Sequence, residues 1–196
     1  MMSISDELAG ARIGRTFNQY AAGPRAPLLR TRLAAYLHAR RDAPIILVGE
    51  APGYRGARFS GIPFTSERQL TGAGPAEATA TIVHRVLAEL GLEDDVLLWN
   101  AVPTHPGTAT TNRPPTQGEI RLGLPFVERL SVGRDVIAIG RLAANALVCP
   151  PPLAWRRSSV RVGARGVVGH GRPLTDPGER QSMAAEESHP TTRGER

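Results

Sequence analysis

The sequence predicts an α/β protein, a three-layer αβα sandwich around a short parallel sheet. Two observations lead to this fold class. Three short apolar runs, 45–48, 96–99 and 136–139, alternate along the chain with segments that have helical spacing. Each run is continuously apolar, which is typical of parallel strands buried on both faces. Strands that alternate with helices form a parallel sheet with helices on both sides.

Two helical segments are expected before the first strand. Residues 3–22 have apolar side chains roughly on one face, which predicts a helix that prolines then interrupt. Residues 28–37 carry Leu and Tyr at helical spacing and predict a second helix, which Pro44 terminates. The first strand, 45–48, follows directly.

Hydrophobic spacing predicts the remaining helices and strands, and Gly and Pro mark the boundaries between them. We expect, in order, a glycine-rich loop at 49–74, a helix at 75–90, a strand at 96–99, a Pro/Thr-rich loop at 101–116, a helix at about 117–130 that contains Pro125, a strand at 136–139 and a helix at 141–148.

Composition divides the chain at about residue 150. The length of 196 residues fits one domain with a sizeable core. Three consecutive prolines, 150–152, end the regular pattern, and few large apolar side chains follow. We therefore expect residues 1–149 to be the folded domain and residues 150–196 to be an atypical, partly disordered C-terminal tail.

Composition also excludes several classes of function. No apolar stretch is long enough to cross a membrane, and the N-terminus lacks the pattern of a secretory signal, so we expect a cytoplasmic location. A single cysteine, Cys149, excludes an internal disulfide and any zinc or iron–sulfur site built on several cysteines. We expect a monomer with no metal and no cofactor.

The basic residues exclude functions that depend on a lysine side chain. All 24 are arginine, and the net charge is +6. Without lysine, the chain has no P-loop lysine for nucleotide phosphates and no lysine amine for a Schiff base. The positive balance suits a polyanion such as DNA, although a genome that favours arginine codons gives the same composition.

The segment that follows the first strand has the most unusual chemistry in the chain. Glu50 stands at the strand end, and Pro52 and Gly53 form a rigid turn whose backbone amides can point into a pocket. Ligands of such sheets bind beyond the carboxyl ends of the strands. Glu50 either handles a water or a developing positive charge, or accepts backbone hydrogen bonds to cap the loop.

Two further side chains are candidates for the same site. Phe64 lies on a glycine-flanked turn and either stacks on a flat ligand or anchors the loop in the core. Asn100 ends the second strand, and its carboxamide has one acceptor and two donors. It either reads the edge of a base or caps the next turn.

Five short motifs stand between residues 45 and 147, namely GEAPG, SGIPF, VLLWNAVP, TNRPPT and AIGRLAANAL. Together they resemble the uracil-DNA glycosylase superfamily. GEAPG resembles the first motif of that family in its Glu-containing branch, and SGIPF resembles the segment with the stacking aromatic. VLLWNAVP is similar to the strand that ends in the base-reading Asn. TNRPPT and AIGRLAANAL resemble two later segments.

The resemblance implies a role for each candidate residue. Glu50 takes the water-activating or charge-stabilising position, Phe64 stacks on the base and Asn100 discriminates it. The implied backbone lining of the pocket comes from Ala51, Pro52, Gly53 and Tyr54.

Two departures from the family pattern stand out. The chain lacks the four cysteines that hold an iron–sulfur cluster in many proteins of this branch. The third motif, His-Pro-Ser or similar, has only two imperfect candidates, His170 and His189.

The implied function is monofunctional excision of uracil, or a related deaminated base, from DNA by hydrolysis of the N-glycosidic bond. The residues leave two alternatives open. One is a catalytically impaired nucleic-acid-binding module of the same fold, and the other is an enzyme that acts on a small nucleoside or nucleotide.

Overall fold

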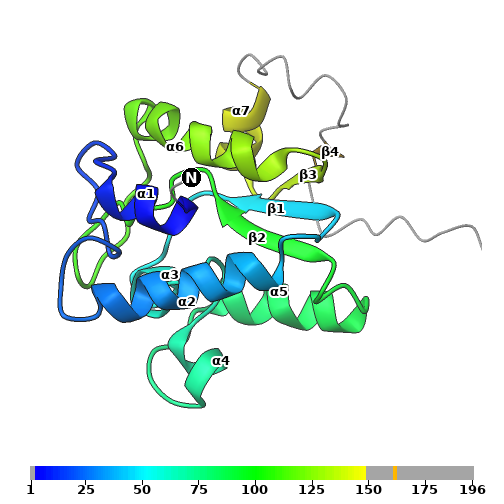
Figure 1. Cartoon of the computed structure of the whole chain (residues 1–196), viewed down its shortest axis with the longest axis horizontal. Helices are drawn as coiled ribbons and strands as arrows, with labels where there is room; N and C mark the ends of the chain where they lie inside the picture. Colours follow the sequence, from blue (N-terminus) through cyan, green and yellow to red (C-terminus); the bar gives the residue numbers. More distant parts are fainter. Residues whose placement is uncertain (1–2, 149–160, 163–196) are drawn as a thin grey trace, which may run out of the picture.

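The computed structural model describes residues 3–148 and 161–162, which form an α/β fold (Figure 1). The elements within these ranges, in chain order, are α1 (Ile4–Gly10), α2 (Ala26–Ala39), β1 (Ile45–Gly49), α3 (Ala57–Ser60), α4 (Glu67–Thr71), α5 (Ala78–Glu89), β2 (Val96–Asn100), α6 (Gln117–Ser131), β3 (Asp135–Ala138), α7 (Arg141–Val148) and β4 (Arg161–Val162).

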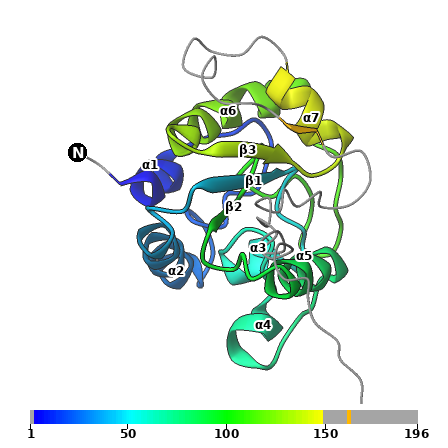
Figure 2. The same ribbon diagram turned by 90° about the vertical axis from the view of Figure 1, so that its right-hand side faces the viewer.

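The strands form one parallel sheet in the order β2-β1-β3-β4. Helices α6 and α7 lie on one side of it, α5 lies on the other, and α2 runs along β2 (Figures 1 and 2). The predicted three-layer αβα class is therefore confirmed. The register pairs Gly49 with Asn100, so the ends of β1 and β2 meet at one edge of the sheet.

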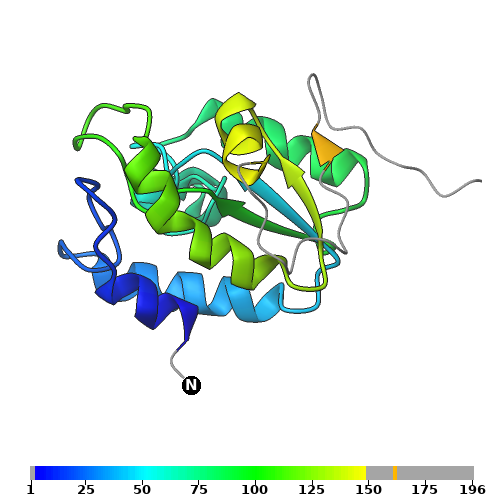
Figure 3. The same ribbon diagram turned by 90° about the horizontal axis from the view of Figure 1, so that it is seen from above.

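Alternate strand residues are buried on opposite faces, which explains the continuously apolar runs. Figure 3, seen from above, shows α6 and α7 lying over one face of the sheet. The strand residues in the larger core cluster, which includes side chains of α6 and α7, are Ile46, Val48, Leu97, Trp99, Val136 and Ala138. Those in the smaller cluster, which includes Val83 and Leu87 of α5, are Leu47, Val96 and Leu98.

Helix α2 protects the outer edge of β2. The Leu98 N–H donates a hydrogen bond of 2.7 Å to the Tyr36 hydroxyl, so an edge donor of the sheet is paired within the chain. Burial of this hydroxyl raises the pKa of Tyr36 to about 12.

The prediction of one helix over 3–22 is wrong beyond Gly10. Helix α1 begins after Ser3, whose hydroxyl accepts a hydrogen bond from the Asp6 N–H, and ends within two turns. Gly14 then adopts a φ of +54°, and the Glu119 side chain occupies the space beside it, 2.5 Å from where a Cβ would lie. A distant side chain, invisible in local periodicity, therefore leaves no room for a Cβ at this turn.

The segment 11–25 instead wraps around the loops that follow β1 and β2. Phe17 and His105 exchange two backbone hydrogen bonds of 2.8 and 3.0 Å. The Tyr20 hydroxyl donates to the Gly61 carbonyl at 2.9 Å, and the Gln19 amide donates to the Pro103 carbonyl at 3.1 Å. Tyr20 and Gln19 are both buried, so these ties are shielded from water.

The predicted loop at 49–74 contains two short helices, α3 and α4, and α4 begins with a capping box of Ser66 and Gln69. The partly disordered tail predicted for 150–196 lies outside the described residues, apart from the short strand β4. No described helix is both long and apolar enough to span a lipid bilayer.

Candidate nucleobase pocket

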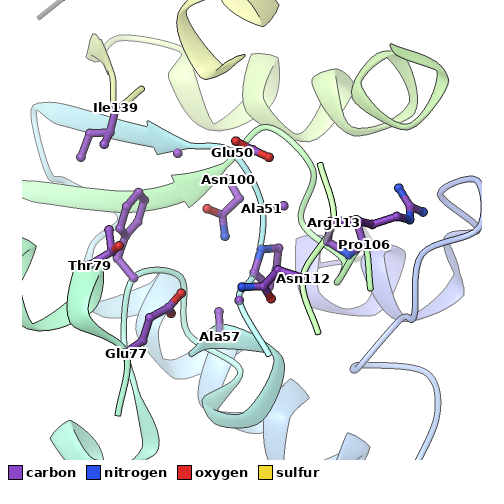
Figure 4. Close-up of a pocket in the computed structure, with 14 residues that line it drawn as sticks. Glu50, Ala51, Ala57, Glu77, Thr79, Asn100, Pro106, Asn112, Arg113 and Ile139 are labelled. Carbon is purple, nitrogen blue, oxygen red and sulfur yellow. The ribbon is translucent and has the colours of Figure 1, made fainter. Parts of the chain in front are cut away.

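A cavity of about 310 Å³ opens at the carboxyl ends of β1, β2 and β3. It lies where the topology of a parallel sheet predicts a ligand site. Its size is within the range of small-molecule pockets. Figure 4 shows the residues that line it, which are Gly49, Glu50, Ala51, Pro52, Gly53, Ala57, Phe64, Glu77, Thr79, Asn100, Pro106, Asn112, Arg113 and Ile139.

Phe64 and Asn100 meet over Gly49. A Cβ on Gly49 would lie 2.8 Å from Phe64 Cε2, closer still to Cζ, and 3.1 Å from Asn100 Oδ1. The absence of a side chain at residue 49 thus lets the ring and the carboxamide approach the same stretch of backbone. The structure therefore brings together two residues that are 36 positions apart in the sequence.

The Phe64 backbone is in an unusual conformation for an aromatic residue. Its φ is 52°, and it is the only non-glycine residue with positive φ in the described part of the chain. Such a conformation costs on the order of 1–3 kcal/mol and is concentrated at functional sites. The ring is half-buried and packs against the smaller core cluster while it also lines the cavity. Both readings of Phe64, ligand contact and loop anchor, are compatible with this position.

Asn100 is 3% exposed and ends the fully buried strand β2. Within residues 3–148 and 161–162, its carboxamide makes no hydrogen bond to another protein group. The predicted alternative, in which it caps the following turn, therefore has no support from the hydrogen bonds of this region. Asn100 lines the cavity, so its donors and acceptor are available to a ligand there.

Glu50 lies at the exposed rim of the cavity. Partial burial raises the pKa of its carboxyl. No backbone N–H of the described chain donates to this carboxylate, so the loop-capping alternative is likewise unsupported. The Glu50 carbonyl accepts a hydrogen bond from the Val102 N–H at 3.0 Å, which ties the rim to the loop after β2.

A buried histidine supports the turn that follows Glu50. The His105 ring is completely buried, with Nδ1 2.7 Å from the Pro52 carbonyl and Nε2 2.8 Å from the Thr108 carbonyl. The Tyr54 N–H donates to Asn112 Oδ1 at 2.9 Å. Ala51, Pro52 and Gly53 line the cavity as expected, whereas Tyr54 is not part of its wall.

A paired arginine holds the TNRPPT segment at the other side of the cavity. Arg113 donates two hydrogen bonds of 2.6 and 2.8 Å to the buried Glu119 carboxylate. These bonds lower the pKa of Glu119 to about 2, and the Thr116 N–H adds to the effect at 2.8 Å. The Arg113 side chain is 36% exposed, so its position is fixed while part of its surface stays accessible.

Sequence reasoning missed several residues of the wall. Asn112 and Arg113 belong to the TNRPPT segment, which was recognised as a motif but given no role. Glu77 had no signal in the sequence, because it precedes a helix in an ordinary polar stretch. It enters the cavity only through the fold, beside Gly53 and Gly56.

The remaining predictions about this site concern metals and the third motif. The described residues contain no group of three or more His, Cys, Asp or Glu side chains that could hold a metal ion. His170 and His189, the two candidates for the third-motif histidine, lie outside the described residues.

Comparison with known proteins identifies the family. No curated protein matches the chain. Residues 37–190 match the family model of the uracil DNA glycosylase superfamily. The match includes all the site motifs and extends past residue 149, where we predicted the domain to end. Because it covers most of the sequence, the chain belongs to the uracil-DNA glycosylase superfamily.

Proposed function

We propose that this protein is a monofunctional DNA glycosylase that removes uracil or a related deaminated base by hydrolysing the N-glycosidic bond. One observation carries the proposal. The ring of Phe64, on a backbone with positive φ, and the buried Asn100 carboxamide, which has no hydrogen-bond partner among the described residues, converge in a cavity with a carboxylate at its rim. This arrangement suits a flat ligand with a polar edge, held next to a reacting bond.

The base has to leave the helical stack before it enters such a cavity, at a cost of a few kcal/mol. Stacking of the base on Phe64 offsets this cost by about 1–3 kcal/mol. Asn100 then pairs with the carbonyl and ring N–H of uracil, because its carboxamide has both an acceptor and donors. Cytosine presents a different donor pattern on that edge and fits less well.

Cleavage leaves the bonding electron pair on the base and positive charge on the sugar. Glu50, at the rim, stabilises that positive charge or orients the attacking water. The resemblance implies a histidine for the negative charge on the base, and His170 and His189 are the candidates. Arginines around the opening, including the exposed Arg55 and the fixed Arg113, contact the phosphates.

An oligonucleotide cleavage assay tests the proposal. The full chain should convert a uracil-containing strand to an abasic strand that breaks on alkali treatment, and Glu50→Gln should abolish this activity. Glu89→Gln, the same change on an exposed surface of α5, should leave it intact.

The alternatives give different results in the same experiments. Salt-dependent DNA binding without cleavage would indicate the binding module. Absence of both, with activity on free nucleosides or nucleotides, would indicate the small-molecule enzyme.

A further inference from the structure

The turn that carries Phe64 is held by hydrogen bonds on both sides of this residue. Ser60 Oγ donates a hydrogen bond of 2.5 Å to the Thr65 carbonyl and accepts one of 3.1 Å from the Ile62 N–H. Ser60, Ile62 and Thr65 are buried, whereas the Phe64 ring lines the cavity. The positive φ of Phe64 therefore lies within a turn whose neighbouring residues are fixed in the interior.

A histidine of α5 adds a contact from outside this turn. His84 Nε2 lies 3.1 Å from the hydroxyl oxygen of Thr65, the residue that follows Phe64. The same hydroxyl donates to the Pro63 carbonyl at 3.1 Å, and a hydroxyl has only one proton to donate. His84 Nε2 therefore carries a hydrogen and is the donor in this contact.

The surroundings of His84 agree with this assignment. Its ring is half-buried, and burial is the main reason that the pKa of His84 is lowered, although the charge of Glu93 and a hydrogen bond with the Phe64 backbone oppose this effect. At neutral pH the ring is therefore neutral and has a single N–H. The Thr65 hydroxyl places that hydrogen on Nε2.

Helix α5 also contacts this region through apolar side chains. The Phe64 ring packs against the smaller core cluster, to which α5 contributes Val83 and Leu87. Val83 directly precedes His84, so one turn of α5 supplies both an apolar surface for the ring and a hydrogen bond to the backbone turn that carries it. The position of the ring thus depends on a helix that follows it in the sequence.

We propose that His84 is a positioning residue, which holds the Phe64 ring in place for stacking by donating a hydrogen bond from Nε2 to the Thr65 hydroxyl. This inference rests on the proposed function, in which the ring stacks on the extruded base. A left-handed backbone is unfavourable for an aromatic residue and persists only where its surroundings enforce it. Loss of the His84 bond lets Phe64 leave this conformation, and the ring then moves away from its place beside Gly49.

The first measurement follows the ring itself and needs no ligand. The chain has four phenylalanines, so labelling with para-fluorophenylalanine gives four fluorine NMR signals, and Phe64→Leu identifies the signal of residue 64. His84→Leu should shift or broaden that signal and leave the others in place. His84→Gln keeps a side-chain N–H donor and should restore a signal close to that of wild type. His38→Leu, the same change at an exposed position of α2, should alter none of them.

The second measurement is the affinity of the full chain for a duplex that contains a non-cleavable 2′-fluoro uracil nucleotide. Stacking on an aromatic ring contributes at least about fivefold per base, so Phe64→Ala and His84→Leu should each weaken binding by about that factor. Thr65→Val removes the acceptor and should have the same effect as His84→Leu, whereas His84→Gln should bind nearly as wild type does. In a Phe64→Ala background His84→Leu should cause no further loss, because the ring that it positions is absent.

The outcomes separate this inference from a structural role and from the proposed function. An unchanged Phe64 signal in His84→Leu overturns the role of His84, and so does a loss of affinity that is equally large without the Phe64 ring. Changes in all four signals together with a lower melting temperature would show a general loss of structure and also overturn it. A wild-type chain that neither binds nor cleaves the uracil duplex contradicts the glycosylase proposal, and the fluorine signals then still decide whether His84 positions the ring.

Discussion

Substitution of Gly49 by alanine is the sharpest test of the arrangement of Phe64 and Asn100. Gly49 is in β1 and does not require a left-handed backbone, so alanine is free of backbone strain there. Its methyl group would lie 2.8 Å from Phe64 Cε2 and closer to Cζ, whereas ordinary carbon–carbon contact is about 3.5 Å. The ring therefore has to move by roughly 1 Å, a displacement that costs on the order of a hundredfold in rate.

The same clash has a cost in stability. Overpacking of this kind destabilises by about 1–3 kcal/mol, which lowers the melting temperature of a chain of this length by about 2–12 °C. Gly10→Ala is the matched control, because nothing lies within 4 Å of its added methyl group and its φ is not positive. That variant should be neutral or slightly more stable.

A double-mutant cycle shows whether the Phe64 ring causes the loss of stability in Gly49→Ala. In a Phe64→Ala background the ring is absent, so Gly49→Ala should cost little more, and the two changes should couple by about 1–3 kcal/mol. Calorimetry or thermal melts of the four proteins measure the coupling, and the cleavage assay measures the rates. Additive effects on stability would refute the contact between the Phe64 ring and Gly49.

Three other predictions concern the reading of the base by Asn100, the loss of folding stability at low pH and the product of the reaction. Asn100→Asp exchanges amide donors for an acceptor-only carboxylate, so uracil excision should fall more than tenfold, and an unchanged rate removes Asn100 from base reading. Because the Glu119 pKa is lowered to about 2 from 4.5, its stabilisation is complete above pH 4.5 and is lost as pH falls toward 2. The stability gap between wild type and Glu119→Gln should narrow over that interval in acid melts, and a constant gap contradicts the pairing with Arg113. Since the chain has no lysine, borohydride should trap no protein–DNA adduct on a uracil duplex, and a covalent adduct would refute monofunctional hydrolysis.

The parts of the fold that were predictable depend on local pattern. Strands β1, β2 and β3 are covered on both faces, so their apolar runs appear in the sequence without reference to the rest of the chain. The end of α1 is different, because the turn at Gly14 packs against the side chain of Glu119, which is more than a hundred residues away. Local periodicity carries no information about such a contact.

The candidate site shows the same division. Glu50, Phe64 and Asn100 stand next to strand ends or in glycine-rich turns, and such positions are visible in sequence. Glu77 becomes part of the cavity only because Gly53 and Gly56 leave space where α5 begins. Tyr54 was expected in the wall by resemblance, and in the structure its N–H donates to Asn112, which lines the cavity.

The segment 11–25 holds the site loops in place, although it lies outside the region that matches the family model. The family match starts at residue 37, yet Phe17, Gln19 and Tyr20 hold the loops after β1 and β2 from outside. A protein trimmed to residues 37–190 would keep every motif residue. It would lose the hydrogen bonds by which segment 11–25 links the loop after β1 to the loop after β2. The part of the chain that holds the site loops in place therefore begins upstream of the region that matches the family model.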